Sequence, residues 1–62
     1  MKRTLVYFLN SIRKVECEYV ILEELQKAFD EKKEYVNAVD YNGNKINKVI
    51  YLDDIQDMVC YN

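Results

Sequence analysis

Three aspartates, Asp53, Asp54 and Asp57, form the densest group of side chains that could carry chemistry. Carboxylates this close together could bind Mg²⁺ or Ca²⁺, or could engage arginines on a protein partner. A calcium loop needs oxygen ligands at alternate positions and a central glycine, and this segment has neither. We therefore interpret the three residues as a helix cap with solvated carboxylates or as a contact for a partner, and we predict no metal site.

Catalytic groups are scarce in this chain. Histidine is absent, which removes the commonest general base and the commonest metal ligand. Gly43 is the only glycine, so no glycine-rich loop can cradle a phosphate. Cys17 and Cys60 lie in alternating apolar patterns, which predicts two buried, reduced thiols rather than a disulfide or redox pair. The composition therefore predicts a protein that is not an enzyme and that uses no cofactor.

Residues suited to binding are better represented. Polar residues crowd one predicted hairpin tip, where binding residues concentrate, and the candidates there are Tyr41, Asn42, Asn44 and Lys45. The chain also has six tyrosines, which supply contact area at low entropy cost, and Tyr35 and Tyr51 offer an alternative site on the face of a sheet. Turn chemistry for the asparagines and rim packing for the tyrosines are the structural alternatives.

The hairpin that would carry these residues has the clearest signal in the chain. Asn42-Gly43 lies between two alternating segments, a pattern typical of a two-residue hairpin loop. Such a loop would pair Val39 with Ile46 and would place Tyr35 and Tyr51 on opposite faces of the ribbon. Because both faces are then partly apolar, both must be covered. The helix can cover one face, and the other must close into a barrel, meet a second subunit or bind a ligand.

The first third of the chain predicts a second hairpin. Residues 4–9 are apolar and β-branched or aromatic, and the segment from Ile12 to Val20 alternates. A turn at Asn10-Ser11 would set Val6 opposite Val15. It would also place Cys17 and Tyr19 on the apolar side of the strand and Glu16 and Glu18 in solvent. Residues 2–14 also fit helical spacing, which leaves a helix as the alternative.

A helix follows, and a short turn and strand end the chain. From Ile21 the apolar residues recur at helical spacing, and Glu23 could pair with Lys27 one turn later. Near the C-terminus, Asp53 is placed to cap a helical turn, and residues 59–61 return to strand character.

The elements together predict one small α+β domain spanning residues 1–62. Its antiparallel sheet consists of two hairpins packed on one helix, in the order β-β-α-β-β, with the short turn and strand at the C-terminus. A strand, a tight turn and a final strand resemble the layout of small SH3-like and Sm-like barrels. This resemblance implies a small barrel as the alternative architecture.

Charge and length limit the partners. The net charge is −2 and the lysines are interspersed with acids, so no basic stripe exists for nucleic acid, and a basic protein surface is the favoured partner. The N-terminal apolar run is too short for a signal peptide or a membrane span, which predicts a cytoplasmic protein without membrane contact. A single short helix covers only one face of a small sheet, so we expect a homo-oligomer.

Two functions fit these limits. The composition is similar to that of short reading frames from phages and mobile elements of AT-rich bacteria, and such proteins often inhibit host enzymes or host defence. We therefore expect a small binding protein that occludes a host protein in the host cytoplasm. The alternative is an oligomeric sponge that sequesters a small signalling nucleotide, with tyrosines stacked on the base and Lys45 or Lys48 at the phosphate.

Overall fold

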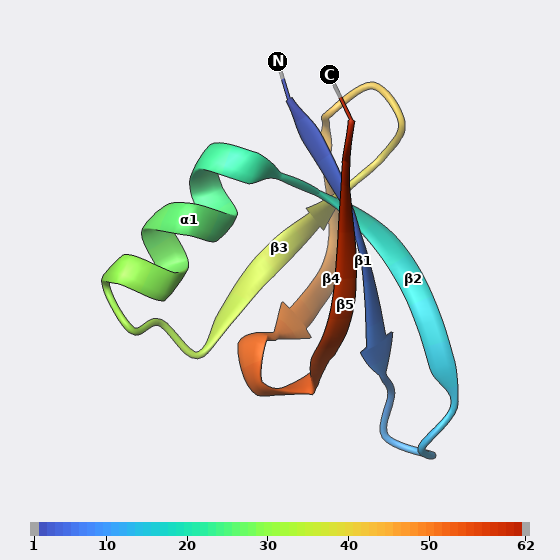
Figure 1. Cartoon of the computed structure of the whole chain (residues 1–62). Coiled ribbons are helices and arrows are strands. Elements are labelled where there is room, and N and C mark those ends of the chain that lie inside the picture. Colours follow the sequence, from blue (N-terminus) through green and yellow to red (C-terminus); the bar gives the residue numbers. More distant parts are fainter. Residues whose placement is uncertain (1, 62) are drawn as a thin grey trace.

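The computed structural model describes residues 2–61. The elements in chain order are β1 (Arg3–Leu9), β2 (Val15–Ile21), α1 (Leu22–Asp30), β3 (Tyr35–Val39), β4 (Lys45–Tyr51), the 3₁₀ turn η1 (Leu52–Asp54) and β5 (Ile55–Tyr61) (Figure 1). All strand pairs are antiparallel, and the sheet order is β4-β3-β2-β1-β5. The predicted α+β class is therefore confirmed, and β4 and β5 form the two edges of the sheet.

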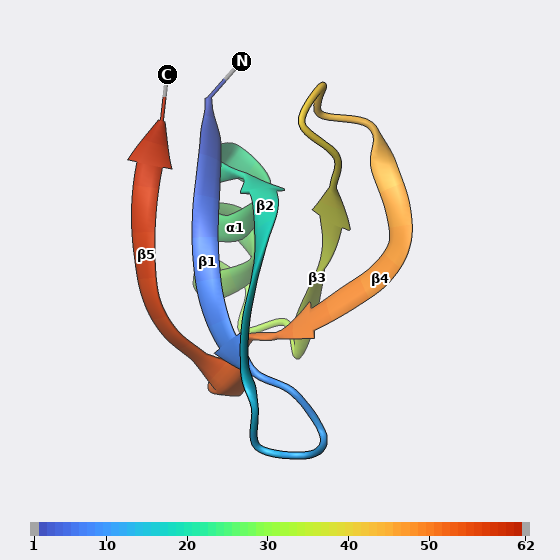
Figure 2. The same ribbon diagram turned by 90° about the vertical axis from the view of Figure 1, so that its right-hand side faces the viewer.

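The sheet is bent sharply between β2 and β3. These two strands pair only at Tyr19 and Val39, and the sheet separates there into a β5-β1-β2 part and a β3-β4 part (Figure 2). The core fills the space between the two parts and α1. Its members are buried apolar side chains, namely Val6, Phe8, Val20, Leu25, Ala28, Val36, Ala38 and Ile50. Leu25 and Ala28 bring α1 into this core, as the helical spacing predicted.

The ends of α1 are satisfied by backbone groups. No side chain caps its N-terminus, and the Leu22 N–H donates to the Lys2 carbonyl instead (3.3 Å). At the C-terminus, Lys32 adopts a left-handed conformation (φ 56°), and its N–H and that of Lys33 return to carbonyls of the last turn. Lys27 pairs with Glu31 (3.8 Å) rather than with Glu23 as expected.

The first hairpin forms, and the helical alternative for residues 2–14 is wrong. Its register also differs from the prediction, because Val6 lies opposite Glu18 and not opposite Val15. The connection is a five-residue loop from Asn10 to Lys14 rather than a two-residue turn. The longer loop turns the other face of β2 inward, so Glu16 and Glu18 point toward the interior, and Val15 is 54% exposed.

The second hairpin forms one residue out of the predicted register. Tyr35 lies opposite Tyr51, and a bulge interrupts the pairing between Asn37 and Val39. A shift of one residue moves side chains to the other face of a strand. Tyr35 and Tyr51, predicted on opposite faces, therefore share one exposed face.

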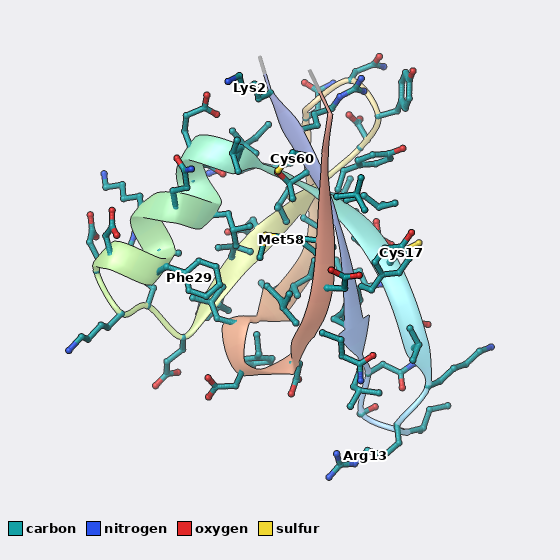
Figure 3. All side chains as sticks on the ribbon, in the orientation of Figure 1. Lys2, Arg13, Cys17, Phe29, Met58 and Cys60 are labelled. Atoms are coloured by element: carbon teal, nitrogen blue, oxygen red, sulfur yellow. The ribbon has the colours of Figure 1, made fainter. Side chains whose placement is uncertain are left out.

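Three smaller expectations also need correction. Cys17 and Cys60 are unpaired thiols, but both are exposed rather than buried, on opposite sides of the sheet (Figure 3). Cys60 Sγ accepts a hydrogen bond from Thr4 Oγ1 (3.6 Å). Asp53 does not cap η1, because Tyr51 is the residue at that position and no side chain bonds there. No helix within residues 2–61 has the length and apolar character that crossing a membrane requires.

Candidate binding surface

The outer side of β3 and β4 carries a pair of exposed tyrosines. The Tyr35 and Tyr51 rings lie 6.0 Å apart in an edge-to-face arrangement, with an interplanar angle of 65°. Tyr35 is 48% exposed and Tyr51 is 52% exposed. Val49 lies two residues before Tyr51, on the same face, and is also exposed. We call Tyr35, Val49 and Tyr51 the tyrosine face.

A hollow of about 460 Å³ adjoins Tyr51, where the end of α1 approaches η1. Phe29, Tyr51 and Leu52 line it, together with four charged residues: Lys32, Lys33, Glu34 and Asp53. Phe29 belongs to the run of apolar residues at helical spacing in α1, but unlike Leu25 and Ala28 it is 46% exposed. Aromatic rings beside carboxylates suit a guanidinium, which can stack on the rings and pair with the acids.

The hairpin tip is a separate surface. Tyr41 is 68% exposed, yet its ring is held by Arg3, whose guanidinium carbon lies 4.2 Å from the ring centroid. Arg3 also donates a hydrogen bond to the Tyr41 carbonyl. Tyr19 meets Tyr41 edge to face with ring centroids 6.0 Å apart. Tyr41 therefore belongs to an arginine–tyrosine cluster of Arg3, Tyr19 and Tyr41, and the Tyr35–Tyr51 pair lies at the opposite end of the β3–β4 hairpin.

The loop that presents Tyr41 is organised by a carboxylate. Asp40 Oδ1 accepts hydrogen bonds from the backbone N–H groups of Asn42 and Asn44, both at 2.9 Å. The bond from Asn44, followed by that from Asn42, outweighs partial burial and lowers the pKa of Asp40 below its usual 3.8. The asparagines thus shape the turn through their backbones, while their side chains remain exposed.

Lys45 does not lie with the rest of the predicted tip. It lines a hollow of about 210 Å³ between α1 and β3, together with Tyr35 and Asn37. Lys27, Lys33 and Glu24 line the same space. Lys45 therefore shares a hollow with Tyr35, one tyrosine of the tyrosine face.

The three aspartates are dispersed. Asp53 lines the hollow beside Tyr51, whereas Asp54 lines another hollow of about 260 Å³ at the same end of β4, against Phe8 and Leu9 of β1. Asp57 lies in β5, where its carboxylate accepts the Met58 N–H (2.8 Å). Across the described residues 2–61, no three acidic, cysteine or histidine side chains gather closely enough to hold a metal ion.

The sequence interpretation missed a charged cluster that faces inward. Lys48 Nζ lies 3.2 Å from Glu18 and 3.5 Å from Glu16, and 5.2 Å from the centroid of the Phe8 ring. Partial burial would lower the pKa of Lys48, but the hydrogen bond and charge of Glu18, with help from Glu16, raise it. The cluster ties β4 to β2 across the bend. Lys48 is thus engaged by two carboxylates within the fold, and its contact with a phosphate stays a prediction.

Comparison of this chain with protein-family models, with curated proteins and with solved structures found no match. Inference about function therefore starts from the surfaces just described. Among them, the tyrosine face with its adjoining hollow combines exposed aromatic area, fixed ring positions and a place for a partner's side chain.

Proposed function

We propose that this chain is a small non-enzymatic binding protein that occludes a host protein through the tyrosine face and the hollow beside it. The observation that carries the proposal is the Tyr35–Tyr51 pair. The two rings are held against each other, about half of each is exposed, and neither belongs to the core. Rings fixed before binding lose little entropy on contact, and tyrosine is enriched at interfaces for this reason.

The hollow indicates the chemistry of the partner. Glu34 and Asp53 line it beside Phe29 and Tyr51, so an arginine of the partner would meet both carboxylates and aromatic rings. Lys33 also lines the hollow, but its ammonium lies 3.7 Å from Glu31 and is partly neutralised. The net charge of −2 adds attraction toward a basic surface and mainly raises the association rate.

Isolation of the chain from its host, followed by native mass spectrometry, tests this function. We expect one partner protein at fixed stoichiometry, and we expect Tyr35→Ala with Tyr51→Ala to weaken the purified complex at least about thirtyfold, as loss of a central contact does. Tyr41→Ala is the matched control, because it removes an exposed tyrosine from the other surface. The opposite result, with Tyr41→Ala disruptive and the double variant neutral, would move the site to the hairpin tip.

A second candidate, a nucleotide sponge, is favoured by one arrangement. Lys45, Tyr35 and Asn37 share a hollow with Lys27 and Lys33, which offers cations for a phosphate and a ring and an amide for a base. A nucleotide at a hundred times its Kd would add about 2.7 kcal/mol of stability and raise the melting temperature. Lys45→Glu should remove this gain, and Lys14→Glu, in the distant first loop, should not. If no nucleotide of a broad panel shifts the melt, the sponge is excluded.

We also propose that the bent sheet is an open SH3-like barrel. Two features support this architecture: β5 pairs with β1 beside β2, and a 3₁₀ turn joins β4 to β5. The likeness concerns architecture alone and identifies no partner. Backbone contacts between β1 and β5 in an NMR spectrum would support it. A β5 that lacks protected amides and contacts to β1 would rule it out.

A further inference from the structure

The two edge strands of the sheet differ in how they are protected. β4 carries Lys45 and Lys48, and lysine on an edge strand discourages pairing with another chain. β5, which runs from Ile55 to Tyr61, has no lysine, arginine or proline, and its only charge is Asp57. β5 is therefore the edge that is open to strand pairing.

The hydrogen bonds of β5 show which backbone groups point outward. The Met58 N–H donates to the Asp57 carboxylate (2.8 Å) and so is turned away from β1. In an antiparallel pair the backbone groups of successive residues point alternately toward and away from the neighbour. Met58 and Cys60 thus present their N–H and C=O groups to the open side, and the Asp57 side chain covers one of the donors.

We propose that β5 pairs with β5 of a second copy of this chain, antiparallel about a two-fold axis at Met58. This centre is the only one that pairs all seven residues of the strand, with Ile55 opposite Tyr61. Asp57 then lies opposite Val59 of the other copy and not opposite a second carboxylate, so the register contains no directly opposed like charges. In the separate chain, Asp57 covers the Met58 N–H, and pairing displaces it.

Both sides of β5 have apolar surface that the second copy would cover. Met58 is 40% exposed on the side that faces α1 (Figure 3), and Val59 is 42% exposed on the opposite side. Met58 shares its side with buried Val6, and Val59 shares its side with Leu5, because these residues are cross-strand partners. An edge of seven residues is only about 23 Å long, so we expect a dimer that dissociates in the micromolar range.

Sedimentation equilibrium of the whole chain, from roughly 1 µM to 1 mM, tests the pairing. The mass should rise from monomer toward dimer with concentration, and Met58→Lys should weaken the dimer at least tenfold by placing two ammonium groups against each other. Val49→Lys is the matched control, because Val49 is 39% exposed on the other edge strand. Asp57→Ala should tighten the dimer severalfold, since the Met58 N–H is then uncovered.

Each contrary result overturns part of the proposal. A wild-type chain that stays monomeric throughout the range excludes the dimer. Disruption by Val49→Lys but not by Met58→Lys assigns self-association to β4 instead. An unchanged affinity in Asp57→Ala removes the covering role of Asp57. Melting curves of both lysine variants establish that the monomers are folded. The β5 edge shares no residue with the tyrosine face, so the results for Met58→Lys and Asp57→Ala leave the proposed function untouched, whereas Val49 belongs to the tyrosine face.

Discussion

The two hairpin loops have the same backbone design and different residues. In Asn10–Lys14 and in Asp40–Asn44, an oxygen of the first side chain accepts the N–H groups of the third and fifth residues, at 2.9 to 3.0 Å. In both, the first and fifth residues are joined by a backbone hydrogen bond, and the fourth N–H returns to the first carbonyl. The fourth residue is left-handed in each loop, but it is Arg13 (φ 65°) in one and Gly43 (φ 86°) in the other.

The comparison separates what defines this loop from what stabilises it. An Asn or Asp at the first position and a left-handed fourth residue are shared, so they define the loop. A carboxylate and a glycine occur only in the second loop. A carboxylate makes stronger hydrogen bonds than an amide, and glycine adopts positive φ without steric cost. We therefore expect the second loop to contribute more stability than the first.

Removal of the Asp40 side chain should have the largest effect. Asp40→Ala leaves the Asn42 and Asn44 N–H groups without their partner, and it frees the turn that sets the register of β3 and β4. We expect a lower denaturation midpoint in urea with an unchanged m-value. Asn10→Ala is the control and should lower the midpoint less, because its bonds are to an uncharged oxygen. If the two variants lose equal stability, the charge of Asp40 contributes nothing.

Exchange of the glycine should have the next effect. Gly43→Ala places a Cβ at positive φ, which costs about 1–2 kcal/mol. Thermal unfolding followed by circular dichroism would report the loss as a lower melting temperature. An Ala variant as stable as the parent would mean that the loop relaxes to a different turn, and the hydrogen bonds of Asp40 would then also change.

The reverse exchange in the first loop should stabilise the protein. Arg13→Gly relieves a non-glycine residue at φ 65°, although glycine also gains freedom in the unfolded chain. We expect a net gain of about 0.5–1 kcal/mol, measured by urea unfolding. Arg13→Ala is the control, since it removes the same side chain and keeps the Cβ. If Ala stabilises as much as Gly, the effect comes from the arginine side chain and not from the backbone.

The loops also show how far the sequence could predict the fold. The helix and the first four strands follow from the periodicity of their apolar residues, and those elements were predicted correctly. The last strand was predicted only at residues 59–61, but β5 already begins at Ile55, directly after the 3₁₀ turn. The registers depend on how each loop closes, and a side-chain oxygen that reaches two later N–H groups leaves no distinctive spacing in the sequence. The sequence does not show that Asp40 closes the loop, so Asn42-Gly43 was interpreted as a two-residue turn. In the structure, Gly43 is the fourth residue of a five-residue loop.

The candidate site was predicted less well, because it depends on those registers. Tyr35 and Tyr51 were proposed as an alternative site on the face of a sheet, but on opposite faces of the ribbon, and their contact exists only in the observed pairing. Glu16 and Glu18 were assigned to solvent by their charge. They lie on the inward face in the observed register, where Lys48 of β4, thirty residues away from Glu18 along the chain, pairs with them. Such compensation between distant charges cannot be predicted from the local pattern of one strand.

Exchange of the first loop residue, Asp40 for Asn and Asn10 for Asp, should have the smallest effect on stability. It compares the two loops most directly, because only the charge at that position changes. The folded state lowers the pKa of Asp40, so its contribution is fully present above the usual pKa of 3.8 and is lost as the pH falls through the lower folded value. Asp40→Asn should lose the small contribution of the charge at neutral pH, and its stability should then fall less than that of the parent on acidification. Asn10→Asp should lose more, because a carboxylate there would accept the same two N–H groups. Urea midpoints from about pH 6 to pH 2 measure both differences. Identical acid dependence in all three proteins would show that a carboxylate in this position is no better than an amide, and Gly43 alone would then distinguish the loops.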